Sequence, residues 1–223
     1  MSLNKALLLV GSPRGTHSTS YSVGAYLGDR LVQKGYEQDV KVLYDYISDE
    51  SKLPELIDAI NSSDFITLAF PLYIDTFPAG IISIMEHIAR ERKKDQNLKQ
   101  PRFFCIVNSG YPEKQQSNNV ILSTKLFADR CKFKWYGNIV IGGGPLIDGK
   151  KVNKLGLLGS LIKTMNLISE SIAKGDESLH PDLSKQAKLL ISKTVYVPLV
   201  QLVIRVILFK KHKLKELNSS PYL

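Results

Sequence analysis

The chain is poor in several residue types, and each scarcity excludes a class of protein. Its 223 residues include only two cysteines. Because Cys105 and Cys131 show no Cys-x-x-Cys spacing, the sequence argues against a metal knuckle or a disulfide framework. We expect both thiols to be buried and inert. No secretory leader precedes the first apolar run, residues 5–10, so we expect a reducing, cytoplasmic setting.

Long apolar runs are also scarce. The longest mainly apolar one, residues 195–209, has 15 residues, and a membrane span needs about 20. Gln201 and Arg205 lie four positions apart, so a helix here would carry a narrow polar stripe. We favour burial of this segment against the core or a partner subunit. An amphipathic anchor on a membrane surface, formed by residues 195–215, is the alternative.

Acidic residues are outnumbered by basic ones, 21 to 30, which leaves a net charge of +9. The excess lies in two clusters, which are Arg90, Arg92, Lys93, Lys94, Lys99 and Arg102, and Lys210, Lys211, Lys213 and Lys215. Such clusters are usually solvated helix ends and loops. Neither is interleaved with the aromatic residues that nucleic-acid binding uses, so we expect no nucleic-acid partner. An anionic small molecule or membrane surface is the functional alternative.

The sequence does contain a regular alternation of apolar runs and helical patterns. The predicted strands are residues 7–10, 40–44, 64–70, 103–107 and 135–141. The predicted helices are residues 21–33, 53–60, 79–89, 120–130, 157–173 and 184–192. Strands that alternate with helices predict an α/β fold with a parallel sheet covered on both faces. We expect one domain over residues 1–180, followed by a C-terminal helical extension over residues 181–223.

The loop between the first strand and the first helix, residues 11–20, reads Gly-Ser-Pro-Arg-Gly-Thr-His-Ser-Thr-Ser. It lacks the lysine of a P-loop, the three glycines of a dinucleotide fingerprint and the cysteine of a thiol phosphatase. It is rich in hydroxyls, contains Arg14 and leads into a helix N-terminus, whose partial positive charge favours an anion. The pattern predicts a loop that holds a phosphate group without cleaving it. The alternative is that Ser18, Thr19 and Ser20 form only a helix cap.

Three other loops are expected at the same edge, because the carboxyl ends of parallel strands face one way. Residues 71–78 follow the third strand and contain Tyr73, and residues 108–113 follow the fourth and contain Tyr111. A run of three glycines follows the fifth strand, and we interpret it as a turn. Either tyrosine alone could be rim packing, but the pair after successive strands favours stacking on a flat ring. The loops therefore predict a composite site for a flat ligand with a single phosphate.

The segments Gly11-Ser12-Pro13-Arg14, Ser18-Thr19-Ser20 and Pro71-Leu72-Tyr73 resemble the flavodoxin-like NAD(P)H-dependent FMN reductase family, and the resemblance extends over residues 5–175. It implies a doubly wound five-stranded parallel sheet with strand order 2-1-3-4-5 and helices on both faces. It also implies the residues that contact FMN. These are Ser12, Arg14, Thr16, Ser18, Thr19 and Ser20 around the phosphate, Pro71, Leu72, Tyr73 and Ile74 along the ribityl chain and ring, and Asn108, Ser109, Gly110 and Tyr111 in the loop at the pyrimidine edge.

The function that the resemblance implies is an FMN-dependent NAD(P)H oxidoreductase with a ping-pong mechanism. NADPH or NADH would be the reductant, and a quinone, a flavin or a nitro- or azo-aromatic compound the small-molecule acceptor. The flavin N5 would carry the chemistry, so we expect no catalytic side chain and no metal, and the family implies a homodimer. A non-enzymatic electron carrier or a regulatory flavin-binding module is the alternative. Flavodoxin carriers are strongly acidic, and the net charge of +9 argues against that role.

Overall fold

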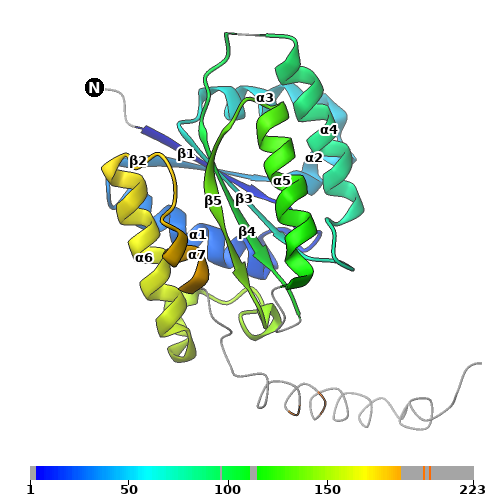
Figure 1. Cartoon of the computed structure of the whole chain (residues 1–223). Coiled ribbons are helices and arrows are strands. Elements are labelled where there is room, and N and C mark those ends of the chain that lie inside the picture. The colour runs from blue at the N-terminus through cyan, green and yellow to red at the C-terminus, as the bar shows by residue number, and fades with distance from the viewer. Residues whose placement is uncertain (1–3, 96, 111–114, 187–197, 199–200, 202–223) are drawn as a thin grey trace, which may run out of the picture. The chain divides into compact units, whose positions relative to one another are not determined.

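The computed structural model describes residues 4–95, 97–110 and 115–186, together with Pro198 and Gln201. The chain divides into two compact units, Met1–Leu190 and Ile191–Leu223. Every helix and strand given below lies in the first unit (Figure 1). Apart from Pro198 and Gln201, the apolar segment 195–209 and the lysines after it lie outside the described residues, so their predicted packing stays a prediction.

Five parallel strands form the sheet. They are β1 (Asn4–Val10), β2 (Tyr36–Val42), β3 (Phe65–Pro71), β4 (Arg102–Asn108) and β5 (Lys134–Ile141). Their order across the sheet is β2-β1-β3-β4-β5. This order confirms the flavodoxin-like strand order 2-1-3-4-5. The order reverses at β1, which pairs with β2 on one side and β3 on the other. Loops leaving the carboxyl ends of β1 and β3 therefore diverge and leave room for a ligand.

Helices cover both faces of the sheet. They are α1 (Thr19–Val32), α2 (Leu43–Ser48), α3 (Leu53–Ser62), α4 (Ala79–Lys93), α5 (Asn118–Arg130), α6 (Gly159–Lys174) and α7 (Pro181–Gln186). The core on one face joins β1 to α1 and α6, and the core on the other joins β1 to α3 and α4 (Figure 1). Leu8 and Val10 point to the first core, while Leu7 and Leu9 point to the second. This alternation explains why the central strand is an unbroken apolar run.

The second strand differs from its prediction over residues 40–44. It begins at Tyr36 and ends at Val42. It is an edge strand that pairs with β1 alone, and it carries exposed polar residues such as Glu37 and Asp39. Those residues hide the strand pattern. Leu43, predicted as strand, instead begins the short helix α2, which buries Leu43 and Tyr46 at helical spacing. Six residues are too few to give a periodic signal in the sequence.

The last predicted helix, residues 184–192, overlaps α7, which starts earlier at Pro181 and is described to Gln186. Residues 187–192 lie outside the described part of the chain. Within the described residues, no helix combines the length and the apolar character that crossing a membrane requires.

Candidate functional site

Four loops leave the carboxyl edge of the sheet, and backbone hydrogen bonds tie each loop to a neighbouring strand or loop. The N–H of Gly11, after β1, donates to the Ala69 carbonyl of β3 at 2.8 Å, and the N–H of Leu72, after β3, donates to the Asn108 carbonyl of β4 at 2.8 Å. The N–H of Ser109, after β4, donates to the Ile141 carbonyl of β5 at 2.9 Å. The structure thus places the loops with the predicted site residues along one edge.

The loop after β1 enters α1 through a short 3-10 turn, η1 (Gly15–His17). Ser18 is the N-cap of α1, and its Oγ accepts a hydrogen bond from the Tyr21 N–H at 3.1 Å. The N–H groups of Thr19 and Ser20 lie in the first turn, where an α-helix offers them no carbonyl partner. α1 has 14 residues, so its aligned peptide dipoles add a partial positive charge at this end. The helix N-terminus can therefore receive an anion.

The hydroxyls of the first turn are turned into the protein. Ser18 Oγ donates to the Gly15 carbonyl at 2.6 Å, and Ser20 Oγ donates to Asn108 Oδ1 at 2.7 Å. Thr19 Oγ1 donates to the Gly144 carbonyl at 2.8 Å. In this arrangement the three residues offer an anion their backbone N–H groups rather than their hydroxyl hydrogens. The Ser20 hydroxyl joins the first turn to the end of β4, and the Thr19 hydroxyl joins it to the loop after β5.

Two other predicted phosphate ligands of the first loop differ in burial. Ser12 is 3% exposed, and its Oγ accepts a long hydrogen bond from the Arg14 N–H at 3.3 Å, which leaves the hydroxyl hydrogen available to a ligand oxygen. Thr16 is exposed on the turn η1. His17 beside it is also exposed, as expected for a solvated loop residue.

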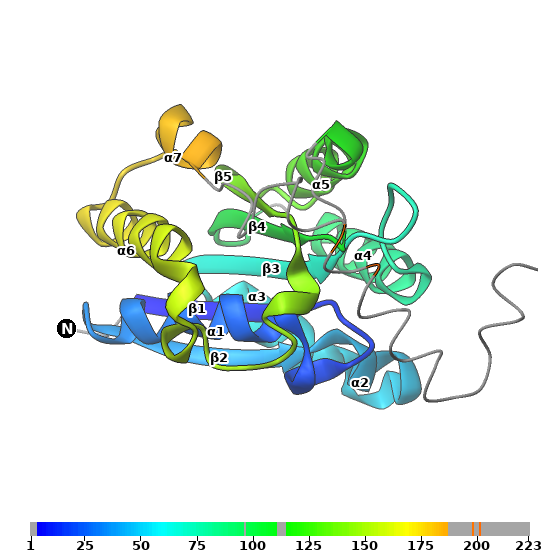
Figure 2. The ribbon, with the colours of Figure 1, turned by 90° about the horizontal axis from the view of Figure 1, so that it is seen from below.

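The Arg14 guanidinium forms an ion pair with the Asp148 carboxylate, Nη1 to Oδ1, at 2.6 Å. Asp148 lies in the loop after β5, which passes beside the first loop (Figure 2). That loop contains the 3-10 turn η4 (Gly144–Leu146), and Gly143 adopts φ 71° before it. The glycine run is therefore a turn, as expected, but it also brings a carboxylate to the predicted phosphate ligand.

The loop after β3 forms a tight turn. Tyr73 and Thr76 exchange both backbone hydrogen bonds, at 3.0 and 3.1 Å. Between them, Ile74 and Asp75 have φ values of 46° and 62°. A left-handed φ is rare for a β-branched residue and costs about 1–2 kcal/mol. Ile74 is also 97% exposed, and Tyr73 is 46% exposed. The turn therefore presents two apolar side chains to solvent beside the predicted ligand, with Pro71 and Leu72 half-buried behind them.

The last residue of β4, Asn108, and the first residue of the loop after it, Ser109, support the site from within. Asn108 and Ser109 are 7% and 3% exposed. Asn108 accepts the Ser20 hydroxyl, and the Ser109 carbonyl accepts the Gly144 N–H at 2.8 Å. Gly110 follows as an exposed residue. Tyr111 lies outside the described residues, so its predicted place at the pyrimidine edge stays a prediction.

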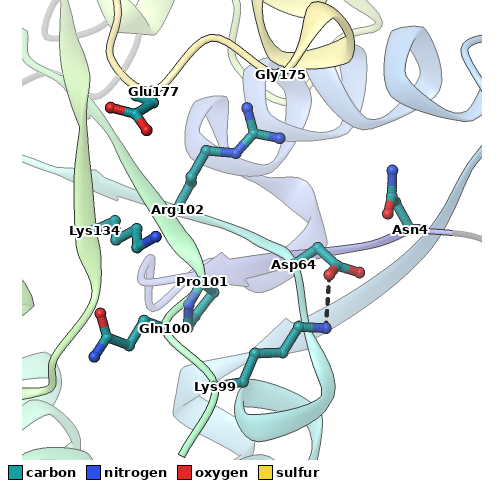
Figure 3. Close-up of a pocket in the computed structure, with 9 residues that line it drawn as sticks. All are labelled: Asn4, Asp64, Lys99, Gln100, Pro101, Arg102, Lys134, Gly175 and Glu177. Carbon is teal, nitrogen blue, oxygen red and sulfur yellow. Dashed lines mark ion pairs between the residues drawn. The ribbon is translucent and has the colours of Figure 1, made fainter.

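A cavity of about 540 Å³ lies at the opposite, amino edge of the sheet (Figure 3). Three of the charged side chains that line it, Asp64, Lys99 and Arg102, have protein partners. Lys99 Nζ lies 2.7 Å from Asp64 Oδ1, and Arg102 Nη1 donates to the Ile172 and Asp176 carbonyls at 3.1 and 3.0 Å. The Arg102 contacts tie the start of β4 to the end of α6. We therefore regard the basic residues Lys99 and Arg102 as structural.

Cys105 and Cys131 are both fully buried, which confirms the expectation for their environment. Burial raises the pKa of each thiol to about 12, so neither is a thiolate near neutral pH. Among the residues that the structure describes, no three His, Cys, Asp or Glu side chains are grouped to hold a metal ion.

Two residues of the site escaped sequence reasoning. Asp148 pairs with Arg14 across 134 positions of sequence, and the Gly144 carbonyl accepts from Thr19 across 125. The dipeptide Asp148-Gly149 is a turn signal, and the backbone there is left-handed, with φ 41° and 75°. The sequence therefore indicated a turn at these residues, but it did not indicate that Asp148 pairs with Arg14.

Comparisons with known proteins agree with this geometry. No family model matches the chain, and no curated protein matches it. Solved structures do. An FMN-dependent NADH-azoreductase from Bacillus anthracis, in complex with FMN, superposes with a TM-score of 0.56 at 17% identity, over 77% of this chain and 100% of its own. An NADH:FMN oxidoreductase in its apo form matches with a TM-score of 0.56 at 12% identity, over 86% of this chain and 97% of its own.

An NAD(P)H:quinone oxidoreductase from Methanothermobacter marburgensis matches with a TM-score of 0.53 at 15% identity, over 81% of this chain and 98% of its own. At these identities the likeness concerns the fold. The chain therefore has the flavodoxin-like fold of these reductases.

Proposed function

We propose that this chain is an FMN-dependent NAD(P)H oxidoreductase that passes electrons to a small-molecule acceptor, a quinone, a flavin or a nitro- or azo-aromatic compound. The observation that carries the proposal is the convergence of loops at the carboxyl edge. The N-terminus of α1 and Arg14 lie there, next to the exposed turn at Tyr73 and Ile74. An anion-binding end beside an apolar rim suits a ligand with one phosphate and one flat ring. The similar structures named above support the choice of FMN.

The donor set fits a phosphate that is bound and not cleaved. The backbone N–H groups of Thr19 and Ser20, the Ser12 hydroxyl and the Arg14 guanidinium can each donate to a phosphate oxygen. None of them is a nucleophile activated by a neighbouring base. The first loop can therefore bind a phosphate without cleaving it. Binding the terminal phosphate of FMN requires no more than that.

Bound FMN would supply the hydride and electron transfer, for which the protein need provide only position and electrostatics. Pro71, Leu72, Tyr73 and Ile74 line the ribityl chain and one face of the ring in this proposal. In the same proposal Ser109 and Gly110 face the pyrimidine edge, and Tyr111 is the next residue of that loop in the sequence. The nicotinamide and the acceptor then use the open face in turn, which gives ping-pong kinetics. The scarcity of cysteine and the two buried thiols accord with a cytoplasmic setting.

The test is the visible spectrum of the purified full-length chain with FMN. We expect the protein to retain FMN through desalting and to bind riboflavin, which lacks the phosphate, more weakly. Anaerobic addition of NADPH or NADH should bleach the flavin absorption band, and a quinone should restore it. Comparison of the two nicotinamides would also establish which reductant is preferred.

The outcomes separate the proposed enzyme from its alternatives. Binding of FMN without bleaching by either nicotinamide would refute the reductase and favour an electron carrier or a regulatory module. A chain that binds neither FMN nor riboflavin would refute the flavin site itself.

We further propose that the chain acts as a homodimer through α4 and α5. An apolar groove of about 350 Å³ runs between these helices. Ile82 and Leu126, which are 41% and 62% exposed, line it, and Leu122 is 61% exposed on α5. Thr76 and Phe77, which follow the turn at Tyr73, line it too. A second copy seated on this face would cover the apolar side chains and lie beside the flavin site.

A further inference from the structure

The ion pair between Arg14 and Asp148 lies inside the anion-binding part of the proposed site. Its side chains are about half exposed, 57% and 52%, and the Nη1–Oδ1 distance is 2.6 Å. A carboxylate is an unusual neighbour for a guanidinium that is to receive a phosphate, because the two anions would repel each other. The pair therefore raises the question of what Asp148 does there.

The backbone, and not the reach of a flexible side chain, places Asp148 beside Arg14. Gly149 follows it with φ 75°, and a Cβ at this glycine would lie 2.7 Å from the His17 carbonyl oxygen. On the other side of Asp148, the Gly144 carbonyl accepts the Thr19 hydroxyl at 2.8 Å. The loop after β5 is thus fitted against the first loop on both sides of Asp148.

The backbone conformation of Asp148 also indicates that the fold holds this residue in place. Its φ is 41°, a left-handed value that asparagine and aspartate tolerate better than other non-glycine residues. The fold therefore keeps this residue in a less favourable backbone region while its carboxylate faces the guanidinium.

We propose that Asp148 sets how tightly the site holds a phosphate group, by competing with it for Arg14. This inference rests on the proposed flavin function. Without ligand, the carboxylate neutralises the guanidinium. A phosphate that enters must displace the carboxylate or share Arg14 with it, and in both cases it binds beside a like charge. Asp148 therefore weakens FMN binding, and it does not affect the binding of a flavin that lacks the phosphate.

The experiment compares Asp148→Asn and Asp148→Gly with the unaltered chain. Both variants remove the charge, and both new residues tolerate a left-handed backbone. Dissociation constants of FMN and riboflavin are measured by quenching of flavin fluorescence, at low and at high salt. Asp129→Asn, an exposed carboxylate on α5, is the matched control, because it changes the net charge by the same amount.

At low salt we expect both Asp148 variants to bind FMN about fivefold more tightly, the factor that corresponds to the upper range for an exposed ion pair. The gain should shrink at high salt, since screening weakens the repulsion that has been removed. Riboflavin affinity should not change, and the Asp129 control should bind FMN like the unaltered chain.

Unchanged or weaker FMN binding in both Asp148 variants would overturn the inference and leave the proposed flavin function intact. An equal gain in the Asp129 control would also overturn it, because net charge alone would then be the cause. If the unaltered chain and all variants bind no flavin, the proposed function fails, and the role of Asp148 fails with it.

Discussion

Burial decides the chemistry of the two thiols. Cys105 lies on β4 and Cys131 directly follows α5, and both side chains are fully buried. Their pKa values are raised to about 12 because burial disfavours the thiolate. In an unfolded chain a thiol has a pKa of about 8.5. Each thiol therefore retains its proton in the folded protein over a pH range in which the unfolded chain has lost it.

This difference predicts a loss of stability at alkaline pH. Between about pH 8.5 and pH 12 the unfolded chain binds fewer protons than the folded one, so the free energy of unfolding falls as the pH rises. Urea denaturation at about pH 7 and about pH 10 measures the slope. Cys105→Ala should cost stability at both pH values through the cavity it leaves, but its slope should be shallower. An unchanged slope in both Cys105→Ala and Cys131→Ala would contradict the prediction.

At the scale of the element, α1 determines where the anion-binding end lies, and small residues allow it to sit close to the sheet. A Cβ at Gly24 would lie 2.4 Å from Leu8 Cδ1, and Leu8 is 2% exposed in the core. Alanine is a better helix former than glycine by about 1 kcal/mol. In this position, however, the close contact outweighs the gain in helix propensity.

We therefore expect Gly24→Ala to lower the free energy of unfolding by about 1–3 kcal/mol, the usual cost of an overpacked core. The matched control is Gly159→Ala, at the first residue of α6. A Cβ there meets nothing within 4 Å, and its φ of −52° is helical, so alanine should be neutral or stabilise by up to about 1 kcal/mol. Urea denaturation of both variants is the measurement, and a Gly24→Ala protein as stable as its control would refute the close contact.

At the scale of the whole molecule, the apolar side chains on α4 and α5 would stay exposed to water in a monomer. If these helices form the homodimer contact, Leu126→Asp should place a charge in the interface and weaken self-association about tenfold. Val32→Asp is the control, because Val32 is 48% exposed but lies on α1, on the other face of the sheet. Sedimentation equilibrium over a range of protein concentrations measures both.

A dimer that Leu126→Asp leaves intact would move the interface to another surface. A wild-type chain that is monomeric at all concentrations would refute the homodimer. Retention of FMN by a monomeric Leu126→Asp variant would show that one copy completes the phosphate site, as expected from the contacts of Arg14 and α1 within one chain.

The sequence by itself determined the alternation of strands and helices, the loop that leads into α1 and the loop with Tyr73 after the third strand. These features follow from local periodicity and turn chemistry, which depend on neighbouring residues. The parallel sheet then brings the predicted loops to one edge without further information. Edge strand β2 and the short helix α2 were misjudged because polar residues and short length hide their patterns.

Only the tertiary structure decided what each side chain of the site contacts. Ser20 donates to Asn108 across 88 positions, Thr19 to Gly144 across 125, and Arg14 pairs with Asp148 across 134. Partners so distant in sequence are set by sheet order and by the path of the loop after β5, and no local pattern encodes them. For this reason the sequence could predict a phosphate-binding loop, whereas the carboxylate that pairs with its arginine became visible only in the folded chain.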